Sequence, residues 1–210
     1  LVISRPVVED CSKVRGFLCD NPIKLWRNGQ FNRIPILSGY MDGDGGVRAL
    51  AYFENQTLFR DLNENFDEIF PKVMEIESLK HPEVTRNNLQ AVKDKYFNGQ
   101  GRLTSNSVED LVKLYTDRSF MVPLANSIKQ MLEVDGKSSS YVYKFSYRGR
   151  KSYSIFYTGN PKDFGTVHCD ELIYLLKSPL LFPAEFEKES NEAKFREKIV
   201  KFLTYFVANG

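Results

Sequence analysis

Two stretches of the sequence predict β-strands, and the long stretch between them follows helical spacing. Residues 34–41 form an apolar run bounded by proline and glycine that does not alternate, which is typical of a buried strand in a parallel sheet. Residues 141–147 alternate with period two and carry their aromatic side chains on one face, which predicts a second strand. Residues 47–133 are expected to be helical. Strands separated by long helical stretches place the chain in the α/β class.

The composition is that of an ordinary globular protein. Hydrophobic residues make up 42% and charged residues 27% of the chain, which argues against disorder. The 29 lysines and arginines nearly balance the 27 acidic residues, so the net charge of +2 gives no reason to expect binding to nucleic acid or to an anionic membrane. No apolar run approaches the ~20 residues that a membrane span needs. We therefore expect no nucleic-acid partner and no transmembrane segment.

Several local signals refine the helical and loop regions. Ser107, with Asp110 three residues later, predicts a capping box at the start of a helix. The pair Asp135-Gly136 predicts the end of the helix that follows. The basic residues 148–151 are expected to form a solvated loop tip. The apolar stripes at helical spacing are Val108, Leu111, Val112 and Tyr115, then Leu124, Ile128, Met131 and Leu132, and finally Phe195, Ile199, Phe202 and Phe206.

The cysteines leave their pairing open. Cys11, Cys19 and Cys169 are an odd number, so one thiol is left for a partner chain or stays free. Asn55 begins a glycosylation sequon, but chance alone produces such a triplet in a chain with this many Asn, Ser and Thr residues. Neither feature decides the compartment.

The sequence does not predict a metal or a cofactor. The two histidines, His81 and His168, with one neighbouring cysteine do not supply the three or four ligands of a zinc site. A calcium loop beginning at Asp42 would place Gly46, Val47 and Phe53 where it needs other residues. The glycine-rich segment 42–46 is therefore either a flexible turn with two solvated carboxylates or part of a different site.

Asp44 and His168 each follow a predicted strand region. A lone histidine before a helix is more often structural than catalytic, but loops at the strand ends of an α/β sheet are where catalytic groups gather. Cys169 beside His168 does not make a thiol–imidazole pair, because adjacent side chains diverge. In α/β-hydrolases the triad follows the order serine, acid, histidine. In that order Asp44 would orient the imidazole, and His168 would accept the proton of the nucleophile and return it to the leaving group.

The nucleophile of such a triad is missing from the sequence. The chain contains no Gly-x-Ser-x-Gly motif and no glycine-rich oxyanion stretch. It opens without an initiator methionine or a visible signal peptide, and it stops on an apolar helical pattern. We therefore expect this chain to be one part of a longer or split protein.

Six groups of residues, in order along the whole chain, resemble motifs of one family. The chain is similar to the C-terminal part of the type-B carboxylesterases, which are cholinesterase-like α/β-hydrolases, and most of all to arthropod esterases, including the juvenile-hormone-esterase-like group. The matching segments are residues 5–9 with 16–18 and 21–22, the acid loop 34–45, the Thr-Asp-x-x-Phe motif 116–120 with Pro123, the strand 141–145, the histidine loop 165–172 with 174–175, and the final helix 202–210.

The resemblance implies a fold and a partner. Residues 1–210 would be the C-terminal portion of one α/β-hydrolase domain, with a mostly parallel central sheet flanked by helices, and would not be a free-standing domain. An N-terminal segment or a second chain of the same esterase would carry the serine and the oxyanion hole. The substrate would be a small apolar ester or another hydrophobic small molecule, with no cofactor and no metal. An extracellular location is expected rather than a cytoplasmic one.

The resemblance also implies the site residues. The acid of the family falls on Asp44 and its histidine on His168, although the family more often has the longer glutamate as the acid. Glu171 is expected either to support the histidine or to cap the helix that follows it. The competing hypothesis is a catalytically inactive relative that serves as a binding, carrier or adhesion protein, because such members keep the fold and lose a triad residue.

Overall fold

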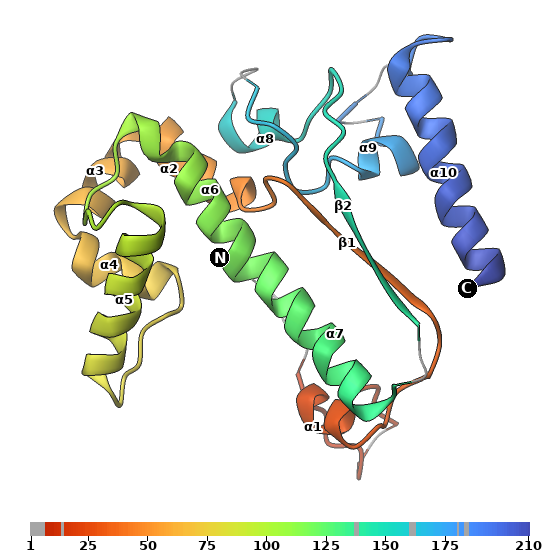
Figure 1. Cartoon of the computed structure of the whole chain (residues 1–210), viewed down its shortest axis with the longest axis horizontal. Coiled ribbons are helices and arrows are strands. Elements are labelled where there is room, and N and C mark those ends of the chain that lie inside the picture. Colours follow the sequence, from red (N-terminus) through yellow and green to blue (C-terminus); the bar gives the residue numbers. More distant parts are fainter. Residues whose placement is uncertain (1–6, 14, 137–138, 160–162, 180, 183–184) are drawn as a thin grey trace.

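The parallel sheet predicted from the strand pattern is present. The structure, a computed structural model, describes residues 7–13, 15–136, 139–159, 163–179, 181–182 and 185–210 (Figure 1). Strands β1 (Ile36–Met41) and β2 (Ser140–Phe145) pair in parallel, in a register that runs from Ile36 opposite Ser140 to Met41 opposite Phe145. A parallel pair needs a long crossover, and here the helical stretch between the strands provides it. The α/β class is confirmed. The first segment of the family resemblance begins at residues 5–6, which lie outside the described residues.

The sheet buries only part of its surface. Met41 and Phe145 are buried at the carboxyl ends of the two strands, where they pack with Ile173 and Tyr174. Tyr141 and Val142 remain about half exposed, at 48% and 51%. The expectation that residues 34–41 form a buried strand therefore holds only at Met41, because two strands leave an open edge on either side.

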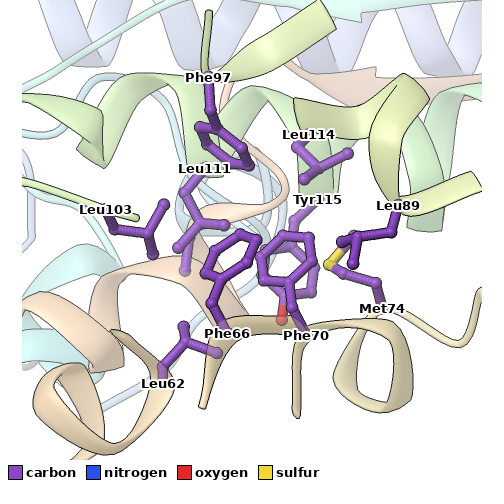
Figure 2. Close-up of a cluster of buried hydrophobic side chains, with 11 residues drawn as sticks. Leu62, Phe66, Phe70, Met74, Leu89, Phe97, Leu103, Leu111, Leu114 and Tyr115 are labelled. Atoms are coloured by element: carbon purple, nitrogen blue, oxygen red, sulfur yellow. The ribbon is translucent and has the colours of Figure 1, made fainter. Parts of the chain in front are cut away.

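The crossover consists of helices, as the apolar spacing predicted. Their bounds are α2 (Gly46–Glu54), α3 (Gln56–Glu64), α4 (Phe66–Val73), α5 (Pro82–Tyr96), a 3₁₀ turn η1 (Ser105–Ser107), α6 (Val108–Thr116), a π-helical turn η2 (Asp117–Met121) and α7 (Val122–Val134). Figure 2 shows a hydrophobic cluster of helices α3 to α6, in which aromatic rings of α4 meet leucines of α6. Phe66 and Phe70 stack with ring centroids 4.4 Å apart, and Phe70 and Leu111 are fully buried.

The N-terminal region lies against the end of α7. Helix α1 (Pro22–Arg27) contacts α7, and a disulfide joins Cys11 to Cys19. Cys169 is the free cysteine. Asn55 lies between α2 and α3, where its side chain accepts hydrogen bonds from the backbone N–H groups of Thr57 and Leu58.

The C-terminal region covers the other side of the strands. It contains α8 (Ser154–Thr158), α9 (Leu172–Leu175) and α10 (Asn191–Asn209), and Figure 1 shows the two strands between α7 and α10. Phe195 of α10 stacks on Tyr147 with ring centroids 3.8 Å apart. Of the predicted stripe on this helix, Phe202 is half exposed. None of the helices in the described ranges is long and apolar enough to cross a membrane.

One local prediction was wrong, and another holds only in part. The capping box lies one turn earlier than expected: Thr104 caps the 3₁₀ turn, and the Ser107 hydroxyl accepts the Thr104 N–H instead of capping α6 with Asp110. The basic run 148–151 is not simply a solvated tip. Arg148 lies 3.0 Å from Asp163, just before the histidine loop, and Arg150, which stays largely exposed, lies 3.0 Å from Glu192 at the start of α10.

Candidate functional site

Asp44 lies in a tight turn directly after β1 and is buried. Its side chain is 2% exposed, and its Oδ2 accepts the backbone N–H of Met41 at 2.8 Å. The next residue must be small, because a Cβ at Gly45 would meet the backbone of Val112 and Thr116 on α6. The alternative of a flexible turn with two solvated carboxylates is therefore wrong for Asp44. Only Asp42 is partly exposed, and it pairs with Lys144 at 2.5 Å.

His168 lies in a turn that extends the sheet by one bridge. Gly43 and Val167 form a parallel bridge beyond the two strands, and the Gly43 N–H donates to the Thr166 carbonyl at 2.8 Å. The loop that precedes α9 is thereby attached to the turn that carries Asp44. Cys169, the residue after His168, has φ +72°, a conformation that non-glycine residues rarely adopt.

The structure brings Asp44 and His168 together. The His168 Nδ1 lies 2.7 Å from the Asp44 Oδ1, and because a carboxylate only accepts, Nδ1 carries the hydrogen in this contact. The hydrogen bond with Asp44 raises the pKa of His168 above its usual range, and burial opposes this shift. The His168 side chain is 39% exposed, in contrast to its partner. Since Asp44 occupies Nδ1, proton exchange with a further group would go through Nε2.

Two aromatic residues contact His168 from other elements. The Phe120 ring of the π-helical turn lies 4.9 Å from the imidazole, centroid to centroid. The Tyr157 hydroxyl of α8 donates to the His168 carbonyl at 2.8 Å. Phe120 belongs to a motif that the sequence marked, whereas nothing in the sequence around Tyr157 singled it out. Its contact depends on how α8 packs, which local spacing does not reveal.

Glu171 lies near His168 but does not cap α9 with its side chain. It occupies the N-cap position, where no side-chain capping hydrogen bond forms. Within the described residues its Oε2 is buried without a hydrogen-bond partner. Burial raises the pKa of this carboxyl, and the charge of His168 opposes the shift. Of the two roles expected for Glu171, the side-chain cap is therefore wrong.

The remaining candidate groups are the Cys169 thiol and His81. Burial raises the pKa of the Cys169 thiol, and the nearby carboxylates raise it further, so the reactive thiolate is disfavoured. His81 lies at the start of α5 with its side chain exposed, 3.3 Å from Glu83. In the part of the chain that the structure describes, no three His, Cys, Asp or Glu side chains gather as a metal site would require.

Comparison with known proteins gives a consistent set of relatives. The sequence model of the carboxylesterase family matches residues 1–210. The chain is 28% identical over 201 residues to juvenile hormone esterase of Tribolium castaneum, covering 92% of this chain and 34% of that protein. It is 26% identical over 206 residues to venom carboxylesterase-6 of Apis mellifera, covering 98% and 36%. It is 25% identical over 199 residues to a carboxylic ester hydrolase of Bombus ignitus, covering 92% and 34%. The chain spans about a third of the length of these curated relatives.

Proposed function

The chain belongs to the carboxylesterase family, and we propose that it supplies the acid and the histidine of a serine carboxylesterase. Asp44 is the acid and His168 the general base. The serine and the oxyanion hole come from an N-terminal segment or second chain of the same esterase, since this sequence lacks the Gly-x-Ser-x-Gly motif. The observation that carries the proposal is the 2.7 Å contact between the buried Asp44 carboxylate and His168.

The geometry supports acyl transfer through a serine ester. His168 would accept the serine proton at Nε2 as the hydroxyl attacks the ester carbonyl, and would then give it to the leaving alcohol. A water molecule would attack the acyl-enzyme in the second step, with the same proton route. Asp44, bonded to Nδ1, would keep the imidazole in the required tautomer and stabilise the imidazolium.

The surroundings of the histidine support an apolar substrate. The Phe120 ring lies against the imidazole, so the wall beside the reacting centre is aromatic. We propose a small apolar ester as the substrate.

The disulfide between Cys11 and Cys19 favours an oxidising compartment, because such bonds are rare in the cytosol. We therefore propose an extracellular location.

The proposal is tested in the protein that contains both this chain and the segment upstream of it. We predict that this protein hydrolyses a short p-nitrophenyl ester and is labelled by a fluorophosphonate probe. His168→Ala should lower kcat by on the order of 10⁴-fold or more while the protein keeps its fold, which circular dichroism checks. His81→Ala is the matched control, because the His81 side chain is exposed and lies beside Glu83 at the start of α5, and it should keep full activity.

Two outcomes would contradict the esterase function. Activity of His168→Ala within a few-fold of the parent would remove His168 from the mechanism. An upstream segment with alanine, glycine or asparagine in place of the serine would favour the inactive binding or carrier protein instead.

A further inference from the structure

The turn that carries His168 is closed twice by one residue, Asp170. The backbone N–H of Asp170 donates to the Val167 carbonyl at 3.1 Å. In the reverse direction, the Val167 N–H donates to the Asp170 Oδ2 at 3.0 Å. His168 and Cys169 are the two central residues of this four-residue turn. The positive φ of Cys169 is what a type II turn needs at its third position.

Asp170 also fixes this turn to the segment before α8. Its Oδ2 accepts the Ser152 hydroxyl at 2.9 Å, and its Oδ1 accepts the Tyr153 N–H at 2.7 Å. The side chain lies in the interior, with the residue only 2% exposed. A buried carboxylate costs free energy unless donors surround it, and here three donors do so. Burial raises the pKa of Asp170, and the hydrogen bonds from these three donors oppose that shift because they stabilise the ionised carboxylate.

The same region also contacts the backbone of His168 itself. Tyr157 lies on α8, shortly after Ser152 and Tyr153, and its hydroxyl donates to the His168 carbonyl at 2.8 Å. Val167, just before the histidine, and His168 itself are therefore both bonded to side chains outside the triad. With the backbone fixed on both sides, the imidazole has little freedom except rotation of its own side chain.

We propose that Asp170 and Tyr157 are positioning residues for His168: they fix the 167–170 turn so that the imidazole meets Asp44 on one side and the serine on the other. This inference rests on the proposed function. Neither residue contacts the reacting atoms; each acts through the backbone of the histidine loop. Loss of such support displaces a catalytic group by a fraction of an ångström, which lowers kcat far more than it changes substrate binding.

The test compares substitutions at Asp170 and at Ser152 in the protein that contains the upstream segment. Asp170→Asn keeps the shape of the side chain but turns a donor toward one of the two backbone N–H groups, and it should lower kcat about 10- to 100-fold. KM should change less than about threefold. Ser152→Ala is the intermediate case: it removes the hydroxyl that donates to Asp170 and accepts the Ser154 N–H, but it leaves the Val167 contact intact. Its kcat should fall less than that of Asp170→Asn. Asp94→Asn, the same substitution at an exposed carboxylate of α5, is the matched control and should keep the parental kcat.

A pH profile separates positioning from a loss of stability. The His168 pKa is raised by the Asp44 contact, so a loosened turn should shift the acid limb of kcat/KM to lower pH in Asp170→Asn. A variant that is merely less stable would contain less active protein but would keep the midpoint.

If Asp170→Asn does not fold, Tyr157→Phe decides. It removes a single hydroxyl from a partly exposed side chain and should lower kcat several-fold, whereas Tyr205→Phe on the exposed face of α10 should have no effect. Parental kcat in every folded variant at 170 and 157, with His168→Ala inactive, would overturn the positioning role alone. Activity of His168→Ala would overturn the proposed function itself.

Discussion

The acid at position 44 is the shorter carboxylate, and its own turn explains how it reaches the histidine. Its Oδ2 accepts the N–H of Met41 three residues earlier, which fixes the plane of the carboxylate. Its Oδ1 then lies 2.7 Å from the His168 Nδ1. Aspartate lacks one methylene of glutamate, so the loop must approach the imidazole closely, and the bridge between Gly43 and Val167 brings it there.

We predict a pH dependence of ester hydrolysis that reports this contact. A general base acts when it is neutral, so kcat/KM should rise with pH through the pKa of His168. The hydrogen bond to Asp44 raises this pKa, so the midpoint should lie above the ordinary 6.5. Asp44→Asn removes the anion and should move the midpoint to lower pH, while the maximal kcat falls on the order of 10⁴-fold because the tautomer is no longer fixed.

Asp42→Asn is the control for this profile. Asp42 lies in the same turn, carries the same charge and pairs with Lys144, away from the imidazole, so its midpoint should match the parent. An unshifted midpoint in Asp44→Asn would contradict the assignment.

The raised pKa of His168 also makes the free energy of unfolding depend on pH. A histidine pKa that is higher in the folded state stabilises the fold below about pH 6.5, and this contribution is lost as pH rises through the folded pKa.

Among the elements, the junction of α6 with the π-helical turn contacts both proposed catalytic loops. The Thr116 Oγ1, at the end of α6, accepts the Gly45 N–H at 2.9 Å, next to Asp44. One turn later, Phe120 lies against the His168 ring. A π-helical turn inserts one extra residue per turn and is often found at functional sites. The Thr-Asp-x-x-Phe motif therefore has a physical role: its threonine supports the acid loop and its phenylalanine the histidine.

We predict that Thr116→Val destabilises the protein. Valine has the same shape but cannot accept the Gly45 N–H, which would be left buried without a partner, at a cost of about 1–3 kcal/mol in the free energy of unfolding. Thr204→Val is the matched control. Both threonines donate to the carbonyl four residues earlier in their helix, but among the described residues no backbone N–H donates to Thr204 on the exposed side of α10. Urea denaturation measures both; equal losses would contradict a special role for Thr116.

The sequence predicts these elements better than their contacts. The two strands and the helical crossover follow from local spacing, because the apolar period is set by the backbone itself. The capping box at Ser107 failed because Thr104, three residues earlier, competes for the same hydroxyl. The π-helical turn has no local sequence signal that separates it from an α-helix, since Thr116 and Val122 on either side are helical.

For the candidate site, the order of the motifs pointed to Asp44 and His168. It gave no role to Asp170, although that residue lies within the marked histidine loop, and it did not mark Tyr157. Apart from the Val167 N–H, which lies three residues before Asp170, these two residues act through contacts with residues 11 to 18 positions away in the chain. Those contacts exist only because α8 folds back on the histidine loop. Spacing within one element carries no information about that path, so only the structure reveals them.

At the scale of the whole molecule, the two hydrophobic clusters differ in how completely they are covered. The helical cluster around Phe70 and Leu111 is fully buried. The sheet cluster around Phe145 is covered by α9 and α10, but Tyr141 and Val142 of the same strand remain about half exposed. Parallel sheets are normally covered on both faces and continued by further strands. This asymmetry is what the proposed N-terminal segment of the esterase would remove by extending and covering the sheet.

Hydrogen exchange of the backbone amides tests that interpretation, with α6 as an internal reference. In the chain alone, we predict that amides of β1 exchange on the order of 10² times faster than those of α6, since a two-stranded sheet is marginally stable and its outer edge is open. In the protein that includes the upstream segment, β1 should gain a second neighbouring strand, and its protection should rise to that of α6. The α6 amides should change little, because Leu111 and Leu114 are already buried. Equal protection of β1 in the two samples would mean that the upstream segment does not complete this sheet, and the serine would then have to reach His168 by another route.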